Sequence, residues 1–164
     1  MKKKNWSEKI IEDILAKHGE NWHFVEMFSP EGERVAQAKS YDPPAWVAYP
    51  DFEKRELGKV VLLVEVKGYN DFFRNSVNTL AMKQYQYAQY FVVQRKECAE
   101  VRVVFVIKKD GKTLFFWEKL DKMSNMEKWF DIVPIKDESG QIKMVNHVFW
   151  NTDEFRTDIE NLGV

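Results

Sequence analysis

The sequence predicts an α/β domain, and three stretches of apolar patterning predict it. Residues 6–18 (WSEKIIEDILAKH) place apolar side chains on one stripe at helical spacing, and Gly19 follows as a stop signal. Residues 59–69 (KVVLLVEVKGY) form a nearly continuous aliphatic run, which is typical of a strand buried on both faces. From about residue 75 to 96 the spacing is helical again. We therefore expect helices packed on a sheet whose central strand is 59–69.

Further strands are expected on either side of these elements. Residues 22–28 and 45–53 are strand candidates, separated by a stretch that contains Gly, Pro and Ser. Residues 100–107 form another strand, which a KKDGK turn joins to a partner at 113–120. The predicted order is helix, three strands, helix, two strands.

The chain shows no repeat, low-complexity tract or linker, so we expect one domain. Its core is expected at about residues 6–120, with a C-terminal extension at about 121–164 in the 1–164 chain. The extension is expected to hold a short helix, a strand pair and a final helix, at residues 125–130, around 137–141 and behind Thr152.

Composition limits the class of protein. At 164 residues and 45% hydrophobic content, the chain can bury a substantial core without disulfides or structural metals. The lone Cys98 cannot form an internal bridge, and no apolar run approaches the ~20 residues of a membrane helix. We expect a cytoplasmic protein with no membrane partner. The net charge of −1 counts mildly against wrapping nucleic acid over a large surface.

The residues that carry chemistry are an acid after Pro50 and an acid–lysine pair in the central strand. Glu65 and Lys67 are two residues apart, so a strand presents both on one face while Val66 points to the other. Charges on a buried strand are costly without a partner or a task. If Asp51 ends the neighbouring strand, its carboxylate can converge with Glu65.

Such a convergence predicts a site for a hard cation. The carboxylates of Asp51 and Glu65 and the carbonyl of Val66 offer the oxygen ligands that magnesium prefers. The ion would bind a phosphate oxygen and lower the pKa of a bound water, while Lys67 orients that water or stabilises charge on phosphorus. The alternative is an ordinary ion pair between Glu65 and Lys67.

The segments YPDF (49–52) and GKVVLLVEVKGY (58–69) resemble the signature of the PD-(D/E)XK nuclease superfamily. The resemblance implies a restriction-endonuclease-like fold, with a mixed central sheet flanked by helices in the order αβββαβ. It also implies hydrolysis of DNA phosphodiesters with magnesium or manganese. The catalytic residues would be Asp51, Glu65 and Lys67, and no organic cofactor is expected.

The opening helix resembles that of archaeal-type Holliday-junction resolvases, which implies a further acidic metal ligand at Glu8. At ~100° per residue, Glu8 lies at the border of the apolar stripe, whereas Glu12 lies further toward solvent. The alternative is that Glu8 is a solvated acid, favourable near a helix N-terminus for its own sake.

The second helix contains Gln86 and Tyr90, which match the QxxxY motif of RecB-type nuclease domains in the same superfamily. The two are one helical turn apart and, with Lys83 and Gln94, form a polar arc. We expect Gln86, Tyr90 and Lys83 to contact DNA. The alternative is that this arc is a solvated face.

The sequence thus predicts a metal-dependent deoxyribonuclease that binds DNA. One alternative is a structure-selective resolvase, which would work as a homodimer so that two cuts are made symmetrically. Another is a non-catalytic module that keeps the fold for binding DNA or a protein.

Overall fold

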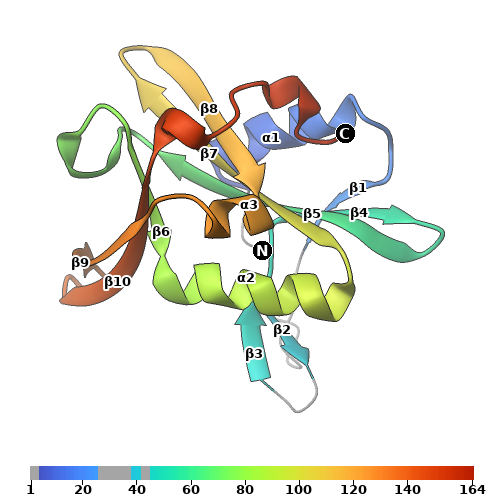
Figure 1. Ribbon diagram of the computed structural model, residues 1–164, viewed down its shortest axis with the longest axis horizontal. Coiled ribbons are helices and arrows are strands. Elements are labelled where there is room, and N and C mark those ends of the chain that lie inside the picture. Colours follow the sequence, from blue (N-terminus) through green and yellow to red (C-terminus); the bar gives the residue numbers. More distant parts are fainter. Residues whose placement is uncertain (1–3, 26–37, 42–44) are drawn as a thin grey trace.

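A five-stranded sheet forms the centre of the molecule (Figure 1). The computed structural model describes residues 4–25, 38–41 and 45–164, so the part of the first predicted strand beyond residue 25 lies outside the described residues. β5 is parallel to β7, and every other neighbouring pair is antiparallel. The order across the sheet is β1 (Trp22–Phe24), β4 (Phe52–Glu56), β5 (Lys59–Tyr69), β7 (Glu100–Lys109) and β8 (Lys112–Lys119).

One helix covers each face of this sheet. α1 (Trp6–Ala16) packs on one face, where Ile11 shares a buried cluster with Val64 and Val66 of β5. α2 (Gln84–Glu97) packs on the other face, toward which Leu63 points. The alternation arises because successive side chains of a strand point to opposite faces. The predicted αβββαβ order and the α/β class, with a mixed central sheet flanked by helices, are confirmed.

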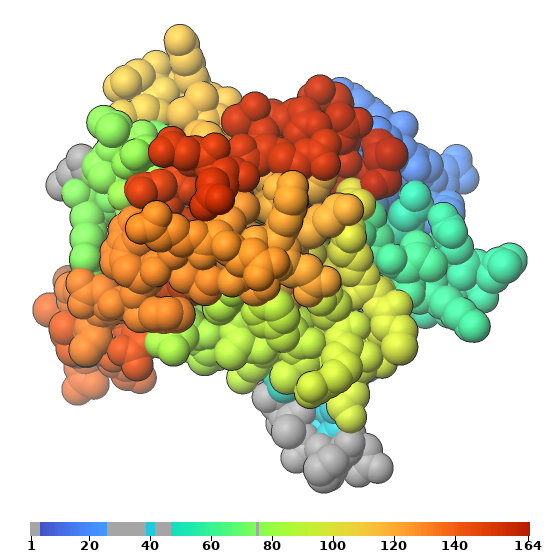
Figure 2. Space-filling view, in the orientation of Figure 1, coloured from blue at the N-terminus to red at the C-terminus, as the bar shows by residue number. Residues whose placement is uncertain are grey.

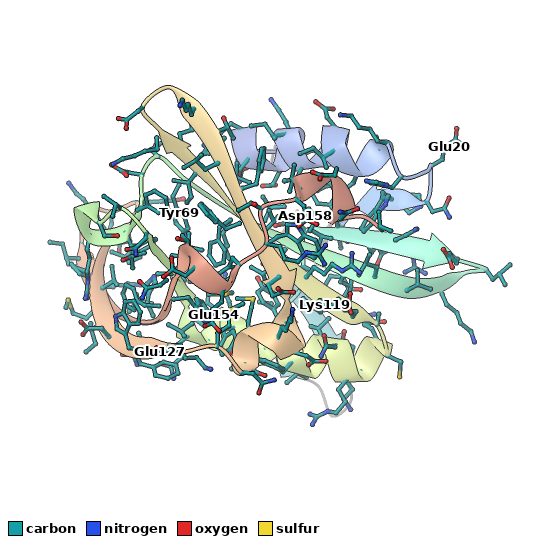
Figure 3. All side chains as sticks on the ribbon, turned by 45° about the horizontal axis from the view of Figure 1, so that its top comes forward. Glu20, Tyr69, Lys119, Glu127, Glu154 and Asp158 are labelled. Carbon is teal, nitrogen blue, oxygen red and sulfur yellow. The ribbon has the colours of Figure 1, made fainter. Side chains whose placement is uncertain are left out.

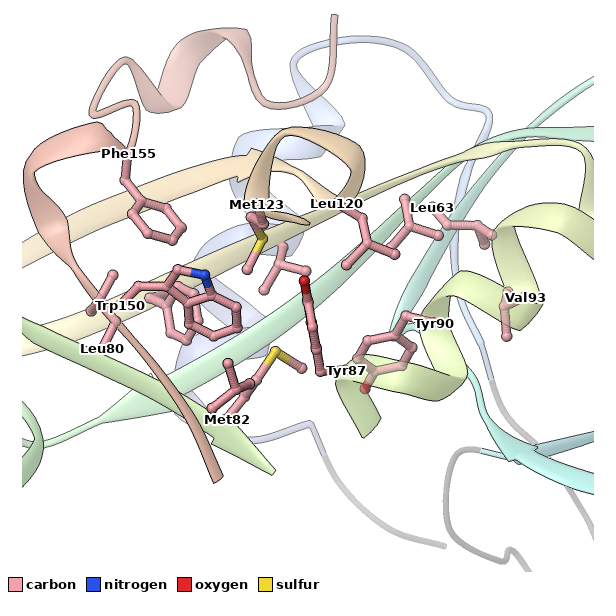
Figure 4. Close-up of a cluster of buried hydrophobic side chains, with 14 of the residues drawn as sticks. Leu63, Leu80, Met82, Tyr87, Tyr90, Val93, Leu120, Met123, Trp150 and Phe155 are labelled. Carbon is pink, nitrogen blue, oxygen red and sulfur yellow. The ribbon is translucent and has the colours of Figure 1, made fainter. Parts of the chain in front are cut away.

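A second sheet lies on the α2 side of the molecule. Its order is β6 (Thr79–Lys83), β10 (Ile142–Asn151) and β9 (Trp129–Lys136), all antiparallel. It shares the core of α2, as the close-up of buried side chains shows (Figure 4). The side chains that β6 and β10 bury there, next to Tyr87 and Tyr90, are Leu80, Met82, Val148 and Trp150.

Smaller elements complete the described chain. A two-stranded sheet, β2 (Ala38–Tyr41) and β3 (Ala45–Ala48), lies against α2. α3 (Leu120–Ser124) follows β8, and the space-filling view shows the segments after it, in orange and red, forming much of one face (Figure 2). None of the described helices is long and apolar enough to cross a membrane. The three short 3-10 helices are η1 (Phe73–Asn75), η2 (Thr152–Glu154) and η3 (Ile159–Asn161).

Four predicted elements differ in the structure. The strand expected at 45–53 is divided between β3 and β4, because Pro50 has no N–H to donate and the chain turns there. The helix expected from 75 begins only at Gln84, since the residues of β6 pair with β10 instead. The helix expected at 125–130 is replaced by the start of β9, and 3-10 turns stand in place of a final helix.

A close backbone approach fixes the start of α1 on β5. A Cβ added at Gly68 would lie 2.3 Å from Ser7 Oγ and 2.5 Å from Ser7 Cβ, distances that require the backbones to separate. Glycine is therefore needed at this position in β5 for steric reasons.

Replacing Gly68 with Ala is expected to lower the free energy of unfolding by about 1–3 kcal/mol, because overpacking forces α1 off the sheet. Thermal or urea unfolding measures this loss. Adding Ser7→Gly, which removes both clashing atoms, should return part of the stability. If Gly68→Ala leaves the stability unchanged, the approach of α1 to β5 is not as close as the structure has it.

Candidate active site

The carboxyl groups of Asp51 and Glu65 meet at one backbone amide. The N–H of Val66 donates to Asp51 Oδ2 at 2.9 Å and to Glu65 Oε1 at 3.1 Å. Both acids are buried, with 8% of Asp51 and 4% of Glu65 exposed. The sequence had suggested that Asp51 ends a strand, whereas it lies in the bend immediately before β4. The convergence that the sequence predicted is nevertheless present.

The pair is electrostatically costly without a cation. Burial raises the pKa of Asp51 well above its usual range, and the charge of Glu65 and a hydrogen bond to it raise the pKa further. The Val66 amide and the charge of Lys67 act in the opposite direction, but they are smaller effects. Two carboxyls in this setting hold a proton between them or require a positive charge.

The carbonyl of Val66 is placed to join the two acids. The ladder between β4 and β5 ends at the pair Phe52 and Val64, so the backbone of Val66 lies beyond it. The N–H and the carbonyl of one residue in a strand point to the same side. Because the N–H of Val66 points at Asp51, its carbonyl points to that side as well.

Lys67 lies next to the acids, on the same face of β5 as Glu65. Its Nζ is 3.7 Å from Glu65 Oε2 and donates to Gln86 Oε1 at 2.6 Å. Gln86 is in the first turn of α2, so the helix that covers this face of the sheet holds the ammonium group. The structure therefore brings together Asp51, Glu65, Lys67 and Gln86 from three segments that are distant in sequence.

Glu8 is buried, and its side chain and backbone take part in the N-terminal cap of α1. Its backbone N–H donates to Asn5 Oδ1 at 2.8 Å and its side chain reaches back to the Asn5 amide, which is a capping box. In the described part of the chain, no group of three His, Cys, Asp or Glu side chains is arranged to hold a metal ion. The structure thus assembles the Asp51–Glu65 pair, and Glu8 stays a predicted further ligand.

The other two residues predicted to contact DNA, Tyr90 and Lys83, lie on different elements in the structure. Tyr90 is 1% exposed and lies in the core, so its side chain cannot reach a nucleic acid bound at the surface. Lys83 is the last residue of β6 rather than part of a helical arc, and it pairs with His147 of β10. Sequence reasoning also missed Tyr69, which follows Glu65 and Lys67 on the same face of β5 and donates to the Ala81 carbonyl at 2.9 Å. The period-2 spacing along the strand was the available signal.

The donor set of this site suits a hard divalent cation. Two carboxyls and a backbone carbonyl are oxygen ligands, and the pair of buried acids is relieved when a cation replaces the proton. His147 belongs to β10 of the second sheet, and Cys98 is exposed at the end of α2. We conclude that the residues present fit magnesium or manganese better than a softer metal.

Comparison with solved structures finds a similar chain in Archaeoglobus fulgidus Hjc, a Holliday junction resolvase from an archaeal hyperthermophile. The TM-score is 0.49 at 12% sequence identity, and the match covers 96% of this chain and 93% of that one. No protein family model matches this sequence, and no curated protein matches it either.

Proposed function

We propose that this protein is a metal-dependent nuclease that hydrolyses phosphodiester bonds in DNA, with residues 1–164 forming one nuclease domain. The observation that supports this most is the convergence of two buried carboxyls on the Val66 amide, beside the amino group of Lys67. A structural ion pair would need one acid and one lysine. The second buried acid adds only cost in the absence of a cation.

The residues divide the work as follows. Asp51, Glu65 and the Val66 carbonyl would hold magnesium or manganese, and Glu8 remains a proposed further ligand. Magnesium bound there would polarise a phosphate oxygen and lower the pKa of a water molecule. Lys67 places a positive charge within reach of a phosphoryl group and can stabilise negative charge that develops on its oxygens. Gln86 fixes the orientation of that ammonium through the 2.6 Å hydrogen bond.

A cleavage assay tests the proposal. Purified protein is incubated with linear and closed-circular DNA, single- and double-stranded, in magnesium, manganese or EDTA. We expect cleavage in either metal and none in EDTA. Lys67→Ala should cut about 10²-fold more slowly, which is the usual cost of removing one group that stabilises transition-state charge.

Lys112→Ala is the matched control, since Lys112 is an exposed lysine at the start of β8, directly after the turn that follows β7. It should cleave at the wild-type rate. If wild type and Lys67→Ala bind DNA equally well but neither cleaves any substrate, the chain is a non-catalytic binding module on this fold. Attack on closed circles would show that the cut is internal.

A further inference from the structure

The second sheet has a face turned away from α2, and this face carries positive charge. Val148 and Trp150 of β10 point into the core with α2. The residues that alternate with them, His147 and Phe149, therefore point to the opposite face. Lys83 lies directly beside His147 in the register of β6 and β10, so its side chain is on that face as well.

An aromatic side chain at the surface lies in the next row of this face. Trp129 of β9 is paired with Phe149, and their rings stack at a centroid distance of 5.6 Å and an interplanar angle of 10°. Phe149 is fully buried, whereas 37% of Trp129 is exposed. One side of the indole thus rests on Phe149, and the remainder is open to solvent.

A second cation is held over the same ring system. The guanidinium carbon of Arg74 lies 4.7 Å from the centroid of Phe149, and 48% of the Arg74 side chain is exposed. Arg74 also forms an ion pair with Asp131 at 2.8 Å, which fixes its position. Burial lowers the pKa of His147, a hydrogen bond with the Val145 carbonyl raises it, and the charges of Lys83, Lys67 and Arg74 lower it. We call this surface the outer platform; it consists of Arg74, Lys83, Trp129, His147 and Phe149.

Packed aromatic rings connect the outer platform to the candidate active site. Tyr69 follows Lys67 on the same face of β5 and contacts β6 through the Ala81 carbonyl. The Tyr69 ring lies 4.8 Å from Phe73, and Phe73 lies 6.0 Å from Phe149 (centroid distances). Figure 3 shows Tyr69 on the side of the molecule where β5 approaches the second sheet. A DNA strand that enters the site at Lys67 would therefore meet Lys83, Arg74 and Trp129 next.

We propose that the outer platform binds unpaired nucleotides of the DNA strand being cut, with a base stacked on Trp129 and phosphates contacted by Lys83 and Arg74. This inference rests on the proposed nuclease function and narrows its substrate to DNA with a single-stranded segment beside the cut. An indole can stack only on a base that has left the double helix, since a paired base has its faces covered. Clustered cations match the phosphates of a nucleic acid strand.

Binding of labelled DNA, measured by fluorescence anisotropy in EDTA so that nothing is cut, tests the proposal. The probes are a single-stranded oligonucleotide and a blunt duplex of the same sequence. Trp129→Leu should weaken single-strand binding about tenfold or more, the usual cost of one base stack, and should change duplex binding much less. Phe130→Leu is the matched control, because Phe130 is the next residue, is 54% exposed and points to the other face of β9.

Lys83→Ala supplies a second readout that does not depend on the packing of Phe149. It should lower the slope of log affinity against log salt by about 0.7, as expected for one lost phosphate contact to a single strand. Unfolding temperatures of all variants are compared with wild type. If Trp129→Leu and Phe130→Leu bind the single strand alike, or if Lys83→Ala keeps the wild-type slope, the proposal is overturned.

The nuclease function and the nucleotide binding by the outer platform can be disproved separately. If wild type cleaves DNA and the platform variants bind DNA as wild type does, only the proposal that the outer platform binds nucleotides is wrong. If wild type neither binds nor cleaves DNA, the nuclease function and the inference that rests on it are both wrong.

Discussion

Replacement of Glu65 with Gln is expected to abolish metal-dependent cleavage. The change keeps the shape of the side chain and an oxygen that can accept from the Val66 N–H, but it removes one of the two buried acids that would hold the cation. Metal ions contribute several kcal/mol to phosphoryl chemistry, so we expect a loss of about 10³-fold or more. Rates of cleavage in magnesium measure it. Glu118→Gln is the control. Glu118 is also buried, but it lies on β8, the edge strand two places from β5. This variant should cleave DNA at the wild-type rate.

The same Glu65→Gln variant should be more stable than wild type when metal is absent. The pKa of Asp51 is raised in the folded protein by burial and by the charge of Glu65. A carboxyl with a raised pKa binds its proton more tightly in the folded state, so stability falls as pH rises from the unfolded value of about 4 through the folded pKa. Removing the Glu65 charge reduces this fall.

Thermal unfolding in EDTA at pH 5 and pH 8 measures that difference. The gap in unfolding temperature between Glu65→Gln and wild type should widen at the higher pH. A variant that still cleaves DNA, or that is less stable than wild type at pH 8, would contradict the arrangement of charges described for this site.

The central part of the fold was predictable because its signals are local. The aliphatic run of β5, the amphipathic stripe of α1 and the turn after β7 each report their own structure. The position of Glu65 and Lys67 on one face of β5 follows from strand geometry alone. The same geometry turns Lys67 toward α2, where its Nζ donates to Gln86. The sequence had indicated Gln86 by a separate signal, the QxxxY motif that it forms with Tyr90.

The second sheet was predictable only in part: the strand pair expected around residues 137–141 is β9 and β10, but β6 is defined by a distant partner. Residues 79–83 have apolar spacing that a helix also allows, and only pairing with β10, more than sixty residues later, makes them a strand. With β6 taken as helix, Lys83 was placed on the wrong element. Tyr90 was assigned to DNA for a related reason: its motif suited a surface, but the core formed by β6 and β10 buries it.

The sequence predicted correctly that Asp51 lies beside Glu65, but it placed Asp51 at the end of a strand, which is wrong. The sequence suggested that a strand ends at this residue, whereas the chain turns at Pro50 and Asp51 precedes β4. What places the carboxyl at Glu65 is the hydrogen bond from the Val66 amide, which lies beyond the end of the β4–β5 ladder. A backbone donor of this kind cannot be seen in a sequence pattern.

Magnesium is expected to bind wild type more tightly as pH rises. Because the pKa of Asp51 is raised, the metal-free site carries a proton that the cation must displace. Below the folded pKa of Asp51, each pH unit should therefore change the affinity about tenfold, which is about 1.4 kcal/mol. The increase should end where Asp51 is already ionised without metal.

Saturating magnesium should raise the unfolding temperature, and the size of this increase measures the affinity at each pH from 5 to 8. A ligand that binds only the folded state stabilises it more when its affinity is higher. Asp51→Asn tests whether the proton on Asp51 causes the pH dependence, because an amide holds no proton for the cation to displace. Its weaker magnesium binding should show little dependence on pH. Equal stabilisation of wild type at both ends of this range would mean that Asp51 does not contact the ion, and the cation would then have to be held without the buried pair.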